Sequence, residues 1–158
     1  NRKYFTLTLV IPTEEHRDDI KRMCRLFHQN SPYQDVPVDE EKLEALVSEF
    51  LHGNKIEKIL LVAIEDDKPV GIIVGVTSEF LLNRMKIATE VMWWVDPDYR
   101  KTSAGTDLVE AYEYWAEKVA KCNLIQLVAL NDRNLQLMNR FYKRRQFVMT
   151  EQAYLRIL

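Results

Sequence analysis

Residues 95–108 read VDPDYRKTSAGTDL, and this stretch decides how the chain is interpreted. It begins at the end of an apolar segment over residues 87–95, whose β-branched and aromatic residues predict a strand. A proline turn and a run of small and basic residues follow. From Thr102 or Ser103 to Lys121 the apolar residues recur with a helical period. The sequence therefore predicts a strand that leads through a tight turn into a helix N-terminus.

Such a helix start suits an anionic ligand, because its first N–H groups are unpaired and carry positive partial charge. Ala104 and Gly105 would let a ligand approach the backbone, and Arg100 and Lys101 add full positive charges. The alternative is an ordinary turn in which Gly105 only packs helix on sheet, and the spacing alone does not decide. Neither the P-loop pattern G-x-x-x-x-G-K-[ST] nor the dinucleotide pattern G-x-G-x-x-G occurs in the chain.

The composition is typical of a soluble globular domain, with 158 residues, 47% hydrophobic and 29% charged. A net charge of −2 does not indicate a nucleic-acid or anionic-membrane partner. The apolar runs are much shorter than the ~20 residues that cross a bilayer. Residues 1–11 are interpreted as a first strand and not a signal peptide. We therefore expect a cytoplasmic protein without a membrane segment.

Hydrophobic periodicity divides the chain into the order β-α-α-β-β-β-α-β-α-β. No linker or internal repeat interrupts it, which predicts one α/β domain with a mixed sheet over residues 1–158. The predicted elements are strands over 4–11, 58–65, 69–79, 87–95 and 124–130, helices over 14–29, 39–52, 103–121 and 132–145, and a strand or hairpin half over 147–158.

The stretch that opens this section resembles the acetyl-CoA loop of the GCN5-related N-acetyltransferases, whose pattern is [Q/R]-x-x-G-x-[G/A]. Its six places are occupied by Arg100, Lys101, Thr102, Ser103, Ala104 and Gly105. Ser103 stands where the family has its first glycine. Residues 134–147, N-x-x-x-x-x-x-F-Y-K-R-R-Q-F, are similar to the family's ending N…(F/L)-Y-x-K-x-G-F, with Gln146 in place of glycine. The resemblance covers residues 4–157 in element order and is specific over 90–147.

This resemblance implies a GNAT-like fold, in which helices flank a central mixed and mostly antiparallel sheet. It implies acetyl-CoA as the acyl donor and a primary amine as the acceptor, on a small molecule or on a protein lysine or N-terminus. Residues 100–106, which include Thr106, would hold the pyrophosphate. The backbone of Trp93, Trp94 and Val95 would pair with the pantetheine arm, and Asn134 would bond the same arm. An equally good interpretation makes Asn134 a first-turn residue of the last helix, with Asn131 as its N-cap.

Two residues are candidates for acid–base chemistry. Glu90 is the one carboxylate inside the apolar strand 87–95, and strict alternation would place it on one face with Met92 and Trp94. The resemblance makes it the general base, and the alternative is a solvated residue at the sheet edge. The resemblance also makes Tyr142 the general acid that protonates the coenzyme A sulfur. The alternative for Tyr142 is an apolar anchor of its helix.

The acceptor is expected over the first two helices and their link, residues 30–53. This region is acidic, which would attract a cationic amine, although a solvated helix face explains the charges equally well. Lys42 is its only fixed positive charge. The acidic residues are Asp35, Asp39, Glu40, Glu41, Glu44 and Glu49.

The remaining residues point to no metal. The two cysteines, Cys24 and Cys122, are interpreted as free thiols, and the three histidines share no ligand spacing. A homodimer through the last strand or the edge of strand 87–95 is a further prediction. Two competing interpretations are a catalytically silent acyl-CoA-binding module, and a nucleic-acid protein that uses the basic run at 143–145, which the net charge disfavours.

Overall fold

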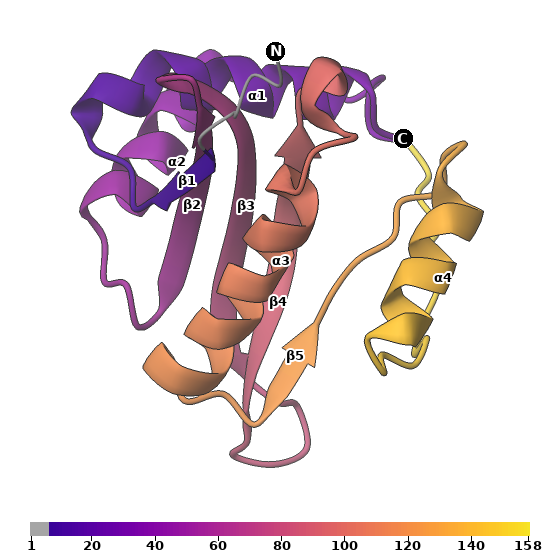
Figure 1. The fold of residues 1–158 in the computed structure, drawn as a ribbon. Helices are drawn as coiled ribbons and strands as arrows, with labels where there is room; N and C mark the ends of the chain where they lie inside the picture. The colour runs from indigo at the N-terminus through magenta and orange to yellow at the C-terminus, as the bar shows by residue number, and fades with distance from the viewer. Residues whose placement is uncertain (1–6) are drawn as a thin grey trace.

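The computed structural model describes residues 7–158, and in it five strands form one mixed sheet in the order β1-β2-β3-β4-β5 (Figure 1). The first four strands are antiparallel to their neighbours, and β5 is parallel to β4. A mixed, mostly antiparallel sheet is thereby confirmed. The strands are β1 Leu7–Val10, β2 Lys58–Glu65, β3 Lys68–Glu79, β4 Lys86–Val95 and β5 Leu124–Gln126. Residues 4–6 of the first predicted strand lie outside the described residues.

Helices α1 (Arg17–Gln29) and α2 (Glu40–His52) cover one face of the sheet. A 3₁₀ turn over Glu14–His16 precedes α1, and Asp39 caps α2 by accepting a 3.0 Å hydrogen bond from the Lys42 N–H. Their apolar sides are buried against the sheet in a cluster that includes Ile20, Met23, Val47, Phe50, Val62, Ile72 and Trp94. Both helices therefore lie close to where the sequence predicts them.

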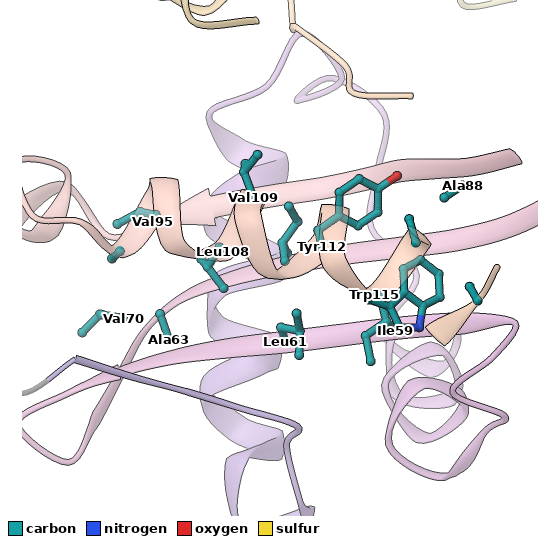
Figure 2. Close-up of a cluster of buried hydrophobic side chains, with 14 residues drawn as sticks. Ile59, Leu61, Ala63, Val70, Ala88, Val95, Leu108, Val109, Tyr112 and Trp115 are labelled. Atoms are coloured by element: carbon teal, nitrogen blue, oxygen red, sulfur yellow. The ribbon is translucent and has the colours of Figure 1, made fainter. Parts of the chain in front are cut away.

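The opposite face is covered by α3 (Ala104–Tyr114), which continues as a π-helical turn over Trp115–Val119 (Figure 2). Leu108, Tyr112 and Trp115 are buried there, as their helical spacing predicts. Val119, next in that spacing, is 43% exposed. The π turn has a wider period than an α-helix, so it rotates Val119 out of the stripe.

Three predictions near the C-terminus were wrong in extent or type. Strand β5 ends at Gln126, although a strand to residue 130 was predicted. Helix α4 is Leu135–Arg144, and its N-cap position is Asn134 and not Asn131. The Asp132 carboxylate accepts the Asn134 N–H at 2.7 Å, which holds the preceding residues in a turn. Residues 147–158 form no strand, because no neighbouring strand pairs with them in the described chain.

The described residues contain no helix long and apolar enough to cross a membrane. Cys24 is buried and Cys122 is half-buried, and both are free thiols. Within residues 7–158, no three His, Cys, Asp or Glu residues are grouped so that they could hold a metal ion.

Candidate active site

Strand β4 carries a β-bulge at its centre. Val74 of β3 lies opposite Met92, but the next residue, Gly75, lies opposite Glu90. Val91 is therefore the extra residue, without a partner on β3, and its side chain is 48% exposed. Bulges of this kind re-aim the neighbouring side chains and are common next to active sites.

The bulge puts Glu90 and Met92 on opposite faces of the sheet. Gly75, the partner of Glu90, faces α3: a Cβ added there would lie 2.5 Å from Cε2 of Tyr112. Val74, the partner of Met92, belongs to the cluster under α1 and α2. The prediction that Glu90 shares a face with Met92 and Trp94 was therefore wrong, because an extra residue interrupts the alternation.

Glu90 is a buried carboxyl group and not a solvated edge residue, because only 5% of its surface is exposed. Burial raises the pKa of Glu90 from an ordinary 4.5 to about 8, and a hydrogen bond with the Val128 backbone partly offsets this rise. The carboxyl group can therefore exchange a proton in the neutral range.

Tyr142 of α4 meets the same peptide. Its hydroxyl donates a 2.6 Å hydrogen bond to the Val128 carbonyl, and its side chain is buried. Burial and the nearby Glu90 carboxylate raise the pKa of Tyr142. The Val128 peptide therefore connects Glu90 and Tyr142, the two candidate acid–base residues, which are far apart in the sequence.

Tyr112 of α3 makes a similar hydrogen bond to Gln126, two residues before Val128. Its hydroxyl donates a 3.0 Å hydrogen bond to the Gln126 carbonyl, and burial, followed by the Glu90 charge, raises its pKa. Val128 could not be predicted from the sequence, because it acts through its peptide group. Tyr112 was visible only as a member of the apolar stripe.

Strand β4 has an open edge beside these residues. The ladder between β4 and β5 has three pairs and ends at Thr89 opposite Gln126, whereas β4 continues to Val95. In Figure 1 the chain after β5 runs away from β4 toward α4. Within residues 7–158, no strand therefore pairs with the β5 side of β4 beyond Thr89. An extended ligand could add there by backbone hydrogen bonds.

The N-terminus of α3 lies at the far end of this edge. The Ala104 N–H donates to the Thr102 hydroxyl at 3.2 Å. In the described chain, the N–H groups of Gly105 and Thr106 have no acceptor. The Ser103 hydroxyl donates to the Asp107 carboxylate at 2.8 Å, so it is already engaged within the protein.

The Trp93 side chain lies next to Gly105 at the start of α3. A Cβ added at Gly105 would lie 3.4 Å from Cζ2 of Trp93, and the Trp93 ring lies 5.9 Å from that of Phe141 on α4. Its indole Nε1 is buried without a hydrogen-bond partner in the described chain. An unsatisfied buried donor is rare in native proteins, so this N–H is a candidate to bind a ligand.

Arg100 is held against β4. Its Nε donates a 2.9 Å hydrogen bond to the Val95 carbonyl, and its guanidinium carbon lies 4.7 Å from the centre of the Trp94 ring. Trp94 itself is buried, and its indole N–H donates to Asp96 at 2.9 Å. Arg100 therefore closes the end of the strand and occupies one of the backbone carbonyls predicted for the ligand.

The other predicted residues are at the surface. Lys101, Ser103 and Thr106 are exposed around the α3 N-terminus. Asn134 is exposed at the start of α4, and its side chain makes no capping bond. The structure thus brings residues 93–106, Glu90 and Tyr142 together around the open edge of β4. Asn134 is connected to this site only because it begins α4, the helix that carries Tyr142.

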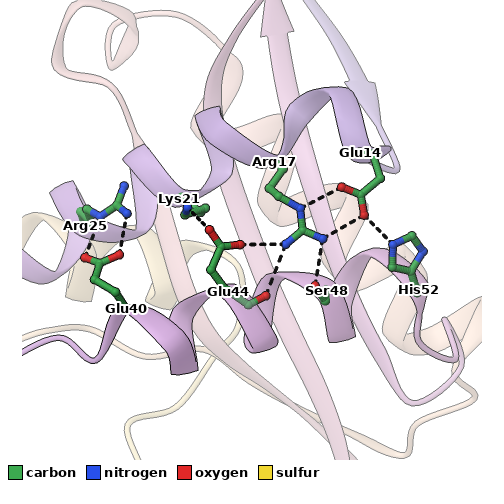
Figure 3. Close-up of polar contacts among 8 residues, drawn as sticks. All are labelled: Glu14, Arg17, Lys21, Arg25, Glu40, Glu44, Ser48 and His52. Carbon is green, nitrogen blue, oxygen red and sulfur yellow. Dashed lines mark hydrogen bonds and ion pairs between the residues drawn. The ribbon is translucent and has the colours of Figure 1, made fainter.

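The acidic face of α2 is largely neutralised by α1 (Figure 3). Glu44 pairs with Arg17 at 3.1 Å and with Lys21, and Glu40 pairs with Arg25 at 2.6 Å. Glu49 pairs with Lys58 of β2. Among the described residues, Asp35, Asp39 and Glu41 make no ion pair, and the Asp39 carboxylate caps α2 instead. The predicted acidic rim is therefore much weaker than the sequence suggests, because its counter-charges come from other elements.

The acetyltransferase (GNAT) family model matches residues 20–147. The chain belongs to this family. The family assignment that the sequence predicts is therefore confirmed. A search by sequence finds no match among curated proteins.

Solved structures resemble this GNAT chain over nearly its full length. A transcriptional regulator from Bacillus halodurans C-125 has a TM-score of 0.76 at 18% identity, and covers 97% of this chain and 100% of its own. An aminoglycoside N-acetyltransferase, AAC(6')-Iy in complex with CoA, has a TM-score of 0.76 at 11% identity, and the match covers 100% of this chain and 98% of that protein's chain. The aminoglycoside acetyltransferase meta-AAC0020 from an uncultured soil metagenomic sample has a TM-score of 0.65 at 18% identity, and the match covers 99% of this chain and 97% of that protein's chain. At these identities the likeness concerns the fold, which is confirmed as a GNAT fold.

Proposed function

We propose that the chain transfers the acetyl group of acetyl-CoA to a primary amine, by direct attack in a ternary complex. The observation that carries this proposal is the buried Glu90 carboxyl group beside the open edge of β4, with a pKa raised to about 8. A general base is most effective when its pKa lies near the working pH. No carboxylate in the predicted loop or on α4 combines burial with this position.

The donor would lie along β4 and end at α3. The free N–H groups of Gly105 and Thr106 suit the pyrophosphate, with the charge of Lys101 beside them. Since Arg100 occupies the Val95 carbonyl, the pantetheine arm would pair with the backbone groups of Trp93, which face the same open edge. The backbone groups of Trp94 alternate to the other side, toward β3. Asn134 is a further donor or acceptor for that arm.

The reaction forms one bond and breaks one. The amine nitrogen attacks the acetyl carbonyl carbon, the C–N bond forms, and the C–S bond to coenzyme A breaks. Glu90, directly or through a water, takes the proton that the nitrogen loses, and Tyr142 gives its hydroxyl proton to the leaving sulfur. No covalent enzyme intermediate is needed, so positioning of the two substrates supplies much of the rate.

Tyr142 can act as this acid only after a change of partner. Its hydroxyl proton points to the Val128 carbonyl at 2.6 Å. Binding of the thioester in the open edge would therefore have to draw the hydroxyl from Val128 to the sulfur. The same observation favours a second candidate function, an acyl-CoA-binding module without turnover, in which Tyr142 only anchors the segment after β5.

The acceptor is proposed as a cationic amine, with Asp35, Asp39 and Glu41 as the acidic groups left outside ion pairs. Two of the structural relatives are named as aminoglycoside acetyltransferases, which supports including aminoglycosides in a first panel. Polyamines and peptides with a free lysine or N-terminus complete that panel.

Calorimetric titration of acetyl-CoA tests the donor site. Thr106→Glu places a negative charge beside the free N–H groups, and Thr106→Gln is its matched neutral control. We expect the Glu variant to lose at least about tenfold in affinity, which corresponds to ~1.4 kcal/mol, while the Gln variant stays near wild type. Equal affinity of the two variants, or no binding by the wild type, would contradict the donor site.

Turnover separates the two candidate functions. Thiol release is measured over the amine panel with the wild type, Glu90→Gln and Tyr142→Phe. The enzyme proposal predicts amine-dependent release that both substitutions reduce. Tight acetyl-CoA binding with no release for any amine would instead support the silent module.

A further inference from the structure

Tyr112 of α3 is a buried tyrosine whose hydroxyl group has no part in the reaction proposed above. None of its surface is exposed, and the centre of its ring lies 6.0 Å from that of Trp115 in the apolar cluster under α3 (Figure 2). A residue that served only this cluster could be phenylalanine, because burying a hydroxyl group costs free energy unless it is hydrogen-bonded. The bond from this hydroxyl to the Gln126 carbonyl therefore points to a role outside the cluster.

Gly75 makes room for the Tyr112 ring directly across from Glu90. Gly75 and Glu90 are opposite each other in the β3–β4 ladder, next to the bulge. A Cβ at residue 75 would lie 2.5 Å from Cε2 and 3.0 Å from Cδ2 of Tyr112, so glycine is needed for this close approach. Cε2 is one bond away from the carbon that carries the hydroxyl group. The hydroxyl end of Tyr112 therefore lies on the same face of the sheet as Glu90 and close to it.

The Gln126 carbonyl marks the point where the sheet divides. Gln126 is the last residue of β5 that pairs with β4, opposite Thr89. Tyr112 donates to its carbonyl at 3.0 Å, and two residues later Tyr142 donates to the Val128 carbonyl. Beyond the ladder the chain is thus held by side chains of α3 and α4. Tyr112 makes the first of these contacts, so it fixes the point at which the chain leaves β4.

The Val128 backbone connects this contact to Glu90. Burial raises the pKa of Glu90, and a hydrogen bond with the Val128 backbone lowers it in part. A bond that lowers the pKa of a carboxyl group stabilises the carboxylate, which can only accept, so the donor is the Val128 N–H. Because Val128 is only two residues beyond Gln126, the position of its N–H depends on where Tyr112 holds the chain.

We propose that Tyr112 is a positioning residue for the general base. By binding the Gln126 carbonyl it sets the path of residues 126–128, and this path keeps the Val128 N–H on the Glu90 carboxylate. The inference rests on the proposed acetyl transfer for the role of Glu90 as a base. Burial, followed by the Glu90 charge, raises the pKa of Tyr112, so its hydroxyl keeps its proton and remains a donor at neutral pH.

The groups around Glu90 leave it as the one that titrates near pH 8. Its charge acts on Tyr112 of α3 and Tyr142 of α4, and the pKa of both tyrosines is raised, first of all by burial. In the described chain Tyr112 is also within reach of Cys122, whose pKa is raised by burial, and of Glu113. From β3 and β5 the site is faced by a glycine and a glutamine, which carry no charge. A titration near pH 8 at this site therefore reports on Glu90.

Tyr112→Phe tests the proposal because it removes the hydroxyl group and keeps the ring. The ¹³C resonance of the Glu90 side-chain carboxyl group, followed by NMR through a pH series, reports its pKa without any turnover. We expect this pKa to rise by up to about one pH unit, the equivalent of one hydrogen bond, because the Val128 N–H no longer supports the carboxylate. Trp115→Phe is the matched control. It removes one buried donor, to the Lys55 carbonyl at 2.6 Å, from the same side of the sheet and leaves the Tyr112 hydroxyl in place.

Hydrogen exchange of the Val128 amide tests the geometry on the same samples. It should be about tenfold faster in Tyr112→Phe than in the wild type, as expected for the loss of one hydrogen bond. The amides of Val62 and Ile72, which are opposite each other in the β2–β3 ladder, serve as the reference for opening of the whole chain. Relative to that reference, the control variant should leave the exchange of Val128 unchanged.

The pH dependence of activity separates positioning from a merely structural role. With the pKa of Glu90 raised, Tyr112→Phe should lose up to about tenfold in kcat/KM near pH 7 and recover at a pH above both pKa values. A structural role would lower activity equally at every pH.

The proposal is overturned if either the Glu90 pKa or the Val128 exchange in Tyr112→Phe stays as in the wild type. It is overturned equally if Trp115→Phe produces the same changes. A raised Glu90 pKa and faster Val128 exchange without turnover of any amine would support the positioning of Glu90 and contradict acetyl transfer, so the two failures are distinguishable.

Discussion

The two sides of this molecule are built differently. On the side of α1 and α2 an apolar cluster is buried, and the ion pairs Arg17–Glu44 and Arg25–Glu40 join the two helices (Figure 3). Strands β2 and β3 pair along their whole length there. On the side of β4 and β5 the ladder has three pairs, a carboxyl group is buried, and two tyrosines bind strand carbonyls.

The difference shows where a substrate can be accommodated. A ligand needs unpaired backbone groups and a proton donor or acceptor, and the apolar cluster under α1 and α2 supplies neither. The β-bulge at Val91 and the early end of β5 supply both. The function proposed above therefore assigns the chemistry to the β4–β5 side and leaves the α1–α2 side as the scaffold.

The largest expected effect is the loss of the base. Glu90→Gln should reduce kcat/KM for amine acetylation by about 10²–10⁴-fold, the usual contribution of a positioned acid or base. In the wild type, activity should rise with pH through about 8, as Glu90 loses its proton, and the variant should lack this rise. Glu65→Gln, at an equally buried carboxyl group on β2, is the matched control. A comparable loss in that control would contradict the distinction between the two sides.

The same carboxyl group should make stability depend on pH. Its pKa is about 8 in the folded chain and near 4.5 when unfolded, so the folded state binds the proton more tightly. The stabilisation is complete below pH 4.5 and is lost as the pH rises to 8, by several kcal/mol. Urea unfolding at a series of pH values should show this fall in the wild type. An identical pH dependence in Glu90→Gln would contradict the assignment.

Gly75→Ala should destabilise the β4–β5 side by steric overlap. The added Cβ would lie 2.5 Å from Cε2 of Tyr112, and overpacking of this kind costs about 1–3 kcal/mol of unfolding free energy. Gly105→Ala should have the opposite sign, about 0.4–1 kcal/mol of stabilisation, because its Cβ meets Trp93 at an ordinary 3.4 Å. Urea unfolding measures both. A Gly75→Ala variant as stable as the wild type would show that the space around Tyr112 is not tight, and a destabilised Gly105→Ala variant would contradict the open space beside Trp93.

The smallest effect is expected on the α1–α2 side. Glu44→Gln removes contacts with the half-buried Arg17 and Lys21. The Glu44 side chain is itself exposed, and ion pairs to an exposed carboxylate contribute little and are screened by salt. Its unfolding midpoint should stay close to that of the wild type, with the difference vanishing in high salt. Acetyl-CoA affinity should be unchanged. A large loss of stability or affinity would make these ion pairs part of the functional unit.

Much of the fold was predictable because the chain is locally consistent. The helices predicted over 14–29 and 39–52 and the strands predicted over 58–65 and 69–79 each lie close to the elements in the structure. The residues of the α3 loop were predictable from one pattern shared with a family. The boundaries of the elements after residue 124 were harder to predict. Strand β5 ends where the Gln126 and Val128 carbonyls accept hydrogen bonds from tyrosines of α3 and α4.

The site could be predicted by residue but not by geometry. A period of two cannot reveal the bulge at Val91, so Glu90 was assigned to the wrong face. A count of charges cannot reveal that Glu40 and Glu44 face cations of α1. The Val128 peptide has no side-chain signature at all. Each of these features depends on contacts between segments far apart in the sequence.

Hydrogen exchange with and without acetyl-CoA tests the central claim most directly, because it reports each side of the molecule separately. The account predicts slower exchange at the open edge of β4 over residues 92–95 and at Gly105 and Thr106, with α1 and α2 unchanged. Protection confined to α1 and α2, or protection of neither side under saturating acetyl-CoA, would contradict it.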